Sequence, residues 1–573
     1  MTLSPRIWLP GLTLVLAILL AWSNTGAAPF VFDDRAAILD NPTIRDLGQL
    51  GAVLTPPADG HAVGGRPLVN LSLALNYAWG GTDPRGYHAV NLAIHALAAL
   101  VLYGLVRRTP WPAPLRDRAA LGAFLVALLW SLHPLQTETV TCVVQRTESL
   151  CALFYLLVLY GVVLVGTASS PLRIRLGTTL AVVAASLGMA TKEVMVTAPV
   201  VAFLYDRTFL AGSWGEVWRR RRGLYLGLAA TWVILAILVW QGSGARGTAA
   251  GWGGGVGTVS YLLLQAKAVA WYLRLVLWPS PLVVDYGPAS PVALGEVLGP
   301  LAVVAALLAV TFWALVRRPV LGFLGAAFFL ILAPSSSLVP LSAQGMAEHR
   351  MYLPLATLVV LLVAGLLRVL GRVAGAVVVP IALLAGLMTW QRNAVYASEV
   401  SLWTDTVAQV PANVRARVNL GAALVEAGQP AAAALQFEAA RRLQPNAPEP
   451  HANLCHVYLK LGRVDEAVAE GEAALALAPG QGMAALNLAE ALYESGNGLA
   501  AGRRFSRAID AYRRAVALVP GYAAARNNLA NALLVTGEVD AAIAEYREVL
   551  RLRPDDRSVQ ENLAQAEAIR TAR

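Results

Sequence analysis

Long apolar stretches separated by short polar ones fill the first 390 residues of the chain. A membrane-spanning helix needs about 17–25 predominantly apolar residues. Stretches that approach or reach this length lie at 7–22, 88–106, 119–133, 149–167, 224–241, 295–316, 320–339, 350–367 and 373–390. The pattern predicts a bundle of membrane-spanning helices, the first of which we interpret as a retained signal anchor.

Two further apolar segments are interrupted by charged residues. The stretch 174–206 contains Thr191-Lys192-Glu193, which predicts two short helices that meet at a polar elbow. The segment 258–278 carries Lys267 and Arg274 beside aromatic residues, and it fits either an interfacial or a re-entrant helix. With these segments included, we expect about 11 spans.

The composition supports this interpretation and removes one alternative. Only 14% of the residues are charged and 57% are hydrophobic, whereas soluble domains carry roughly 25% charged residues. The net charge of +10 does not indicate nucleic-acid binding, because the arginines cluster in short runs between apolar stretches, as the positive-inside bias requires. These runs contain Arg107, Arg108, Arg116, Arg118, Arg173, Arg175, Arg219–Arg222, Arg317, Arg318, Arg368 and Arg372.

The arginine runs also predict an orientation. If they are all cytoplasmic, the N-terminus is inside, the spans alternate consistently and the tail after Trp390 emerges outside. The outer side then collects most of the unusual polar residues, and such groups usually line a cavity or pathway. They are Asp33, Asp34, His133, Glu138, Arg146, Glu148, Lys192, Glu193, Glu348, His349 and Arg350.

The residues from about 411 onward form a different, repetitive pattern. Pro411, Pro445, Pro479, Pro520 and Pro554 follow one another at intervals of 34, 34, 41 and 34 residues, and 34 is the period of tetratricopeptide repeats. Each unit contains an Asn-Leu pair, and a glycine follows at the expected helix turn: Gly428, Gly462, Gly496 and Gly537. The longer interval predicts a seven-residue insertion around 498–504 that extends one helical hairpin. Such solenoids bind proteins or peptides, and the alternative is a passive spacer or oligomerisation arm.

The adjacent acids Asp33 and Asp34 are the first candidate chemistry in the chain. They follow the first apolar stretch and therefore lie in the first outer loop. This placement points to a membrane enzyme with its active site at one face of the bilayer. The alternative is that the pair caps a helix that starts near Arg35, since Asp is a good N-cap.

An ordered set of motifs resembles the transmembrane and tetratricopeptide-repeat O-mannosyltransferases. The motifs are Phe30-Val-Phe-Asp-Asp34 with Asn41-Pro42, Arg66-Pro-Leu with Asn76-Tyr77, Gly86-Tyr-His-Ala-Val-Asn91 with His95, His133-Pro-Leu-Gln-Thr-Glu138, Gln145-Arg-Thr-Glu148, Thr191-Lys-Glu193 and Ala347-Glu-His-Arg-Met-Tyr-Leu-Pro354. The resemblance implies an all-α protein: a polytopic membrane domain of the GT-C glycosyltransferase fold and a repeat α-solenoid. It also implies a polyprenyl-phosphate sugar donor, a protein hydroxyl acceptor on the outer face and inversion at the anomeric carbon.

Roles for individual residues follow from this reaction. A carboxylate within reach of the acceptor hydroxyl can serve as the base, and we slightly prefer Asp34 over Asp33. Its neighbour could orient the acceptor or bind a cation. Transfer needs no metal if protein cations hold the leaving phosphate, so a divalent cation is optional.

The candidate phosphate-binding cations are Arg146, Lys192 and Arg350. Their alternatives are a charge pair Lys192-Glu193 at a helix break and a snorkelling Arg350. Candidate cavity-lining residues are His88, His133, Glu138, Glu193 and His349. His88 and His95 lie two helical turns apart on one face, a spacing that also suits packed histidines, which we favour.

The expected organisation is a membrane domain over 1–392, a linker over 393–410 and a repeat domain over 411–573. We expect an inner-membrane protein with a cytoplasmic N-terminus and external repeats that engage an acceptor or partner protein. Two rival functions remain open: a non-catalytic envelope scaffold, and a ligase or polymerase of lipid-linked glycans. Cys142, Cys151 and Cys455 form no CxxC motif, and we expect packed thiols rather than a Cys142–Cys151 bridge.

Overall fold

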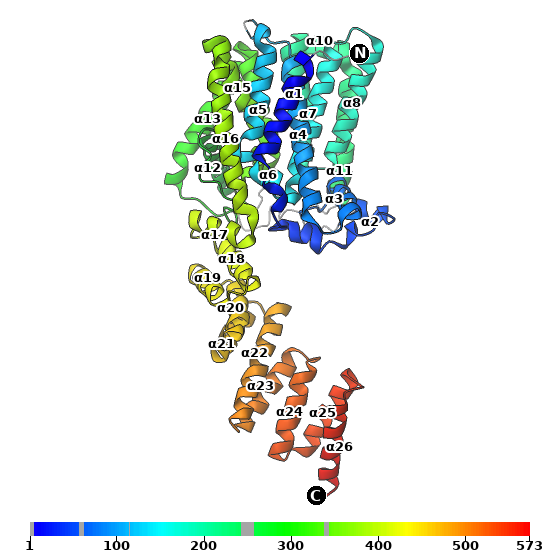
Figure 1. Cartoon of the computed structure of the whole chain (residues 1–573), viewed down its shortest axis with the longest axis vertical. Coiled ribbons are helices and arrows are strands. Elements are labelled where there is room, and N and C mark those ends of the chain that lie inside the picture. The colour runs from blue at the N-terminus through cyan, green and yellow to red at the C-terminus, as the bar shows by residue number, and fades with distance from the viewer. Residues whose placement is uncertain (1–4, 57–61, 114, 242–256, 337–342, 573) are drawn as a thin grey trace. The chain divides into compact units, whose positions relative to one another are not determined.

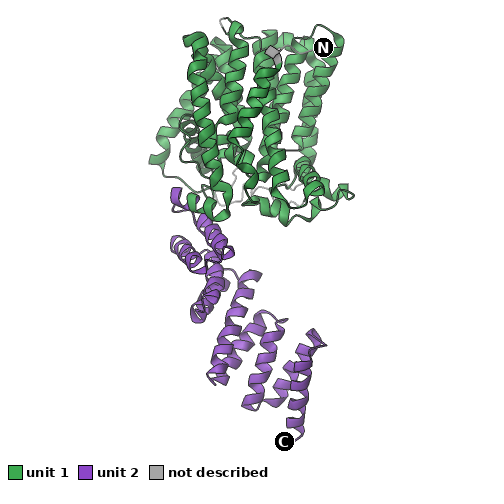
Figure 2. Cartoon of the chain, viewed as in Figure 1, with its two compact units in different colours: residues 1–405 green, residues 406–573 purple. Residues whose placement is uncertain are grey.

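The computed structural model describes residues 5–56, 62–113, 115–241, 257–336 and 343–572. The chain divides into two compact units, residues 1–405 and 406–573 (Figure 2). The described residues are helical and contain no β-strand, so the all-α prediction is confirmed. The stretch expected as a linker, 393–410, contains the short helix η12 (Ala394–Ala397) and α17 (Glu399–Gln409).

The first unit is built from α-helices joined by short 3₁₀ and π segments (Figure 1). Its helices are α1 (Pro5–Ala21), α2 (Leu50–Leu54), α3 (Pro67–Gly80), α4 (Pro84–Arg108), α5 (Ala119–Leu132), α6 (Thr137–Thr141), α7 (Arg146–Gly166), α8 (Pro171–Met189), α9 (Ala198–Asp206), α10 (Trp214–Ala230), α11 (Trp232–Gln241), α12 (Thr258–Leu277), α13 (Leu294–Arg317), α14 (Pro319–Leu332), α15 (Pro354–Leu370) and α16 (Ala374–Asn393), followed by α17. The short segments used below are η2 (Arg35–Leu39), η6 (Val143–Gln145), η7 (Glu193–Thr197) and η10 (Glu348–Met351).

Seven helical runs in the described part are long and apolar enough to cross a membrane, or eight if one bent pair counts as a span. This number is lower than the 11 expected from the sequence. Some expected spans, such as α1 and the helix Pro319–Ser335, fall in the shorter class of 10–17 residues. The run Pro354–Ala397 counts once although it has 44 residues. A straight helix of that length would measure about 66 Å, about twice the thickness of a bilayer core. It contains α15 and α16, both of which pack against α5.

The two interrupted apolar segments are both helical. The two helices expected in 174–206 meet at the Thr191-Lys192-Glu193 elbow, but they are longer than expected, because Pro171–Met189 and Glu193–Ala211 each have 19 residues and qualify as spans. Segment 258–278 is the continuous helix α12, in which Lys267 pairs with Glu296 at 2.6 Å.

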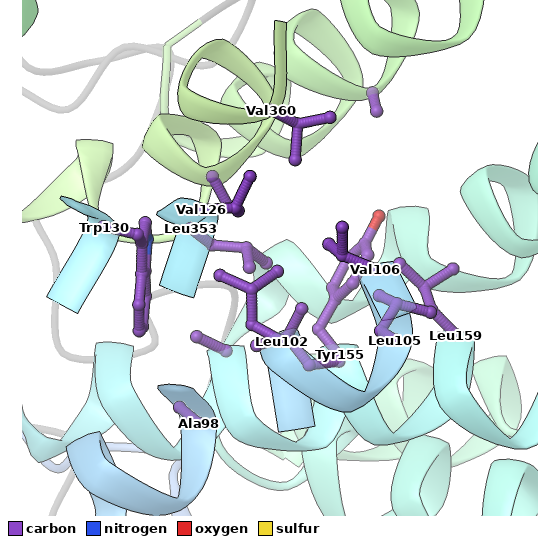
Figure 3. Packing of buried hydrophobic residues seen from close by; sticks show 14 of the residues in the cluster. Ala98, Leu102, Leu105, Val106, Val126, Trp130, Tyr155, Leu159, Leu353 and Val360 are labelled. Atoms are coloured by element: carbon purple, nitrogen blue, oxygen red, sulfur yellow. The ribbon is translucent and has the colours of Figure 1, made fainter. Parts of the chain in front are cut away.

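The core of the membrane unit lies where α4, α5, α7 and α15 meet (Figure 3). Leu102 and Val106 of α4 face Val126 of α5, Tyr155 of α7 and Val360 of α15. Farther out, α7 and α8 approach so closely that a Cβ at Gly161 would lie 2.7 Å from the Gly177 carbonyl oxygen. Small residues permit this backbone contact, which is typical of helices packed in a membrane.

The loops of the unit gather at two opposite ends. At one end, Arg118 donates to the Leu367 carbonyl at 2.6 Å, and Arg221 pairs with Asp206 at 2.5 Å. The first contact joins the loops around 107–118 and 367–372, and the second lies within 206–222; all three loops carry arginine runs. The opposite end holds α2, α3 and α6 and the acidic motifs (Figure 1). The expected outer loops at 242–257 and 340–350 lie partly outside the described residues.

The second unit is a series of antiparallel helix pairs. It contains α18 (Val414–Glu426), α19 (Pro430–Leu443), α20 (Pro448–Lys460), α21 (Val464–Leu477), α22 (Gly482–Ala501), α23 (Phe505–Leu518), α24 (Ala523–Thr536), α25 (Val539–Leu552) and α26 (Arg557–Thr571). Consecutive helices pack against one another, as a repeat solenoid requires.

One glycine does not have the role expected for it. Gly428, Gly462 and Gly537 adopt left-handed φ angles of 72–87° at their helix turns, as C-terminal glycines do. Gly496 instead lies inside α22, which has 20 residues against 13 in α18 and α20. The turn has moved to Arg503, which takes the left-handed φ of 56°. The insertion therefore lengthens α22 by about two turns.

Candidate active site at one end of the membrane unit

The two candidate acids of the first loop have different environments. Asp34 is fully buried. Its Oδ1 accepts from the Val144 N–H at 2.7 Å, and its Oδ2 accepts from the N–H groups of Val143 at 3.1 Å and Val31 at 3.2 Å. Asp34 thus caps η6 and the start of α7, a helix distant in sequence from the one at Arg35 that the capping alternative named. Burial raises its pKa to about 6, and the backbone donors oppose this shift.

Asp33 is only half-buried, and it follows a residue in an uncommon conformation. Phe32 has a φ of +54°, a left-handed value that costs a bulky side chain energy and persists only when the surroundings hold it. Such outliers cluster at functional sites. Of the two acids, Asp33 has the side chain less enclosed by protein.

Arg146 is fully buried in a cage of neutral oxygen atoms. Its Nε donates to Asn91 Oδ1 at 2.6 Å, its Nη1 to Asn76 Oδ1 at 2.7 Å and its Nη2 to the Tyr87 carbonyl at 3.0 Å. Each of the three guanidinium nitrogens therefore donates at least one hydrogen bond within the protein. This arrangement ties α3, α4 and α7 together.

Four of the predicted polar residues form a chain of contacts: Glu138, His349, Glu148 and Lys192. His349 Nδ1 lies 2.6 Å from Glu138 Oε1, its backbone N–H donates to Glu138 Oε2 at 3.2 Å, and its Nε2 lies 3.9 Å from Glu148. Glu148 in turn forms an ion pair with Lys192. The alternative of a charge pair at the helix break thus takes another form: Lys192 pairs with Glu148 of α7, and Glu193 lies 3.7 Å from Arg66.

Burial determines the protonation of His349. It lowers the His349 pKa to about 3, so the ring is neutral near pH 7. Burial also raises the pKa of Glu138 to about 8. The proton between His349 Nδ1 and Glu138 Oε1 can therefore come from either group, and the second ring nitrogen, Nε2, remains available for a further hydrogen bond.

Glu348 and Arg350, on either side of His349, hold neighbouring loops. Glu348 Oε1 accepts from the Val283 N–H and the Tyr286 hydroxyl, each at 2.6 Å, which fastens the segment 279–293 to η10. Burial raises the Glu348 pKa to about 8, and the charge of Arg392 opposes that shift. Arg350 is 7% exposed and donates to the Gln344 carbonyl at 2.6 Å. It does not snorkel from a span end.

Arg66 and Arg392 also belong to this cluster, and sequence reasoning did not assign either of them to the site. Arg66 is 6% exposed, lies 3.7 Å from Glu193, and its positive charge acts on His349. Its Nε is buried and has no hydrogen-bond partner among the described residues. One signal was available: Arg66 falls in a loop that the sequence predicts to be outer, where the positive-inside bias does not account for an arginine.

The remaining predicted histidines are packed. His88 Nε2 lies 2.9 Å from the Ala28 carbonyl oxygen, and His95 contacts the Tyr352 hydroxyl at 2.7 Å between Trp22 and Trp130. His133 Nδ1 accepts from the Leu135 N–H at 3.2 Å and caps the turn before α6.

Within the described residues, no group of three or more His, Cys, Asp or Glu side chains could hold a metal ion, and Cys142 and Cys151 are buried free thiols.

An apolar cavity of about 560 Å³ opens beside this cluster. It lies between α5, α12, α15 and α16, and its lining includes Leu129, His133, Val276, Trp278, Leu362 and Met388. His133 is both a wall of the cavity and the cap of the turn that leads to Glu138. A hydrophobic chain and a polar reaction centre could therefore be held next to each other.

The fold and the site define a multi-pass helical membrane protein that has a buried charged cluster at one end and carries a helical repeat array. A family model described as tetratricopeptide repeat matches residues 454–502 and 493–557, and a second with the same description matches 424–470. The repeats predicted from the 34-residue period are thereby confirmed.

Curated relatives support the resemblance predicted from the membrane motifs. The chain is 38% identical over 141 residues to protein O-mannosyl-transferase Tmtc1 of Drosophila melanogaster, a match that covers 23% of this chain and 16% of that protein. It is 35% identical over 162 residues to protein O-mannosyl-transferase TMTC4 of Mus musculus, covering 25% and 21%. The chain thus spans only about a fifth or less of the length of these relatives.

Among solved structures, the crystal structure of MamA protein matches with 19% identity and a TM-score of 0.24, covering 27% of this chain and 81% of that chain.

Proposed function

We propose that the protein is a membrane glycosyltransferase that moves a mannose-type hexose from a polyprenyl-phosphate donor to a protein hydroxyl on the outer face of the inner membrane. The observation that carries this proposal is the buried charged cluster at the end of the membrane unit opposite the arginine runs. The similarity to protein O-mannosyl-transferases supports the reaction class. The topology would place the N-terminus in the cytoplasm.

Asp33 is our choice for the base. The acceptor oxygen attacks the anomeric carbon while its proton passes to the Asp33 carboxylate. The bond from that carbon to the phosphate oxygen breaks, and polyprenyl phosphate leaves with the electron pair, which inverts the anomeric carbon. Asp34 positions this loop, because its oxygens are already bonded to three backbone N–H groups.

Arg66, Lys192 and Arg350 are our choice for the donor phosphate. The Arg66 Nε–H group is buried and has no partner among the described residues, so it can donate to a phosphate oxygen without breaking a bond that the structure shows. Arg146 drops out of this role because asparagine and carbonyl oxygens occupy it. The neutral His349 would hydrogen-bond to a sugar hydroxyl through Nε2, with Glu138 holding the orientation of the ring.

The apolar cavity beside His133 would receive the polyprenyl tail. Its lining is almost entirely hydrocarbon and aromatic, so it offers a prenyl chain the same environment as the bilayer. The repeats would engage the acceptor or a partner protein, which is the usual role of such solenoids.

The test is transfer of labelled sugar from polyprenyl-phosphate donors to envelope protein in membranes that contain the full chain. Wild type should label protein, and Asp33→Asn should lower the rate by at least about 100-fold, the scale of losing a general base. An exposed arginine on the same side, in Arg85→Gln, serves as the control that keeps wild-type rates.

Other outcomes would favour the rival functions. No label from any donor sugar, together with a phenotype that needs only residues 411–573, would indicate a scaffold. Transfer only from donors with long glycans would indicate a ligase or polymerase.

A further inference from the structure

Helix α17 connects the candidate site to the repeat unit through the chain itself. It spans Glu399–Gln409, and the first compact unit ends within it at Asp405. Two of its residues that belong to the first unit contact segments of the candidate site. Neither contact involves a residue assigned above to binding or catalysis.

The first contact holds the left-handed residue before Asp33. The Trp403 side chain is 2% exposed, and its ring meets the Phe32 ring edge-on, with centroids 5.2 Å apart and an interplanar angle of 80°. A phenylalanine at φ +54° persists only where its surroundings over-determine it. Trp403 is the aromatic partner that this structure supplies for it.

The second contact holds Arg392, a member of the buried charged cluster. Asp405 Oδ2 accepts from Arg392 Nη1 at 2.6 Å. The other terminal nitrogen of Arg392, Nη2, is buried and has no hydrogen-bond partner among the described residues. The Arg392 charge acts on Glu348 and Glu138, the two carboxylates that flank His349 in the cluster. Asp405 therefore holds a guanidinium whose charge acts on the carboxylates of the cluster.

We propose that α17 is a positioning element of the active site: Trp403 sets the backbone at Phe32-Asp33, and Asp405 sets Arg392 toward the Glu348 cluster. The same helix continues into the repeat unit at Thr406. The geometry of the site consequently depends on a helix shared with the repeats. This inference rests on the proposed transferase function for its kinetic effects, and on the contacts alone for its structural effects.

The test uses full-length protein with four substitutions in α17. Trp403→Ala removes the ring, Trp403→Phe keeps an aromatic edge, and Asp405→Asn weakens the hold on Arg392. Thr404→Ala is the matched control, since Thr404 is exposed on the same helix. Hydrogen exchange of peptides that cover 28–40 and 346–353 is measured alongside kcat and the donor KM.

Trp403→Ala should speed exchange in 28–40 by about tenfold or more and leave the membrane helices and repeats unchanged. It should lower kcat by up to about 100-fold, as a misplaced reacting group does, with little change in donor KM. Asp405→Asn should speed exchange in 346–353, Trp403→Phe should recover most of the wild-type values, and Thr404→Ala should match wild type.

Unchanged exchange in 28–40 after Trp403→Ala would overturn the proposal. So would exchange that rises uniformly across the first unit, because Trp403 would then be an ordinary core residue, and so would a Trp403→Phe variant as impaired as Trp403→Ala. If wild type transfers no sugar, the proposed function fails, while the exchange data still decide whether α17 orders the loop.

Discussion

Asp33 and Asp34 illustrate how two identical neighbouring side chains acquire different roles. Asp34 turns inward, where its two oxygens accept the N–H groups of Val143 and Val144 at a buried helix start and that of Val31 in its own loop. Asp33 lies half-buried after the left-handed Phe32. A carboxylate surrounded by donors is well suited to hold a loop, whereas a less enclosed one can meet a substrate.

The first residue-scale prediction separates these roles. Asp34→Asn puts an amide NH₂ group against backbone N–H donors, because an asparagine has only one accepting oxygen. We expect a loss of about 1–3 kcal/mol in local stability, seen as faster hydrogen exchange at Val143 and Val144 together with lost transfer. Asp33→Asn should lose transfer with wild-type exchange. Equal exchange effects in both variants would contradict the division of roles.

Arg146 makes the same point for cations. From the sequence it resembles a phosphate ligand, but it is a structural residue because amide and carbonyl oxygens surround it. Whether a charged side chain can bind a ligand depends on the groups that surround it in the folded protein, and the sequence does not specify those groups.

At the scale of elements, the repeat insertion lengthens helix α22, and two glycines of this helix have different surroundings. Gly496 faces the next helix, where a Cβ would lie 2.5 Å from the Tyr512 ring, whereas a Cβ at Gly498 meets nothing within 4 Å. Both glycines lie inside α22, so substitution by alanine carries the same intrinsic gain in helix propensity at each position.

We therefore predict opposite effects for these two substitutions. Gly496→Ala should destabilise the α22–α23 pair by about 1–3 kcal/mol through overpacking, and Gly498→Ala should stabilise it by up to about 1 kcal/mol. Hydrogen exchange of α22 and α23 peptides in the full chain gives both values. A stabilising Gly496→Ala would contradict this prediction, because it would mean that the Tyr512 ring moves aside for the added methyl group.

At the scale of the whole molecule, the membrane unit separates its charges by kind. The arginine runs gather at one end, and the candidate site lies at the other (Figure 1). The positive-inside bias then assigns the arginine end to the cytoplasm. The site and the start of α17 share the other end and would face outward.

This orientation predicts the behaviour of reporter fusions. Alkaline phosphatase, which is active only after export, should be active when fused after Arg573 and inactive when inserted after Arg318. A fluorescent protein that folds only in the cytoplasm should give the reverse pattern. Phosphatase activity at Arg318 with none at Arg573 would invert the topology and place the site in the cytoplasm.

The sequence by itself determined the features that depend on local or periodic chemistry. Apolar stretches predicted membrane helices, and the 34-residue period predicted the repeats, because burial in lipid and stacking of like units both leave regular patterns in composition. The motif set also gathered Glu138, Glu148, Lys192, Glu348 and His349, which the structure brings to one end of the unit. The number of spans and the position of Gly496 were less accessible, since both depend on which neighbour a helix meets.

Only the tertiary structure decided the partners of the charged groups. It paired Lys192 with Glu148, enclosed Arg146, left a donor of Arg66 without a partner among the described residues, and brought Trp403 to Phe32 across more than 350 residues of chain. A charge near a membrane helix can be satisfied by any of several distant groups of similar chemistry. Which one it meets depends on helix packing over the whole unit, and the local sequence carries no record of that choice.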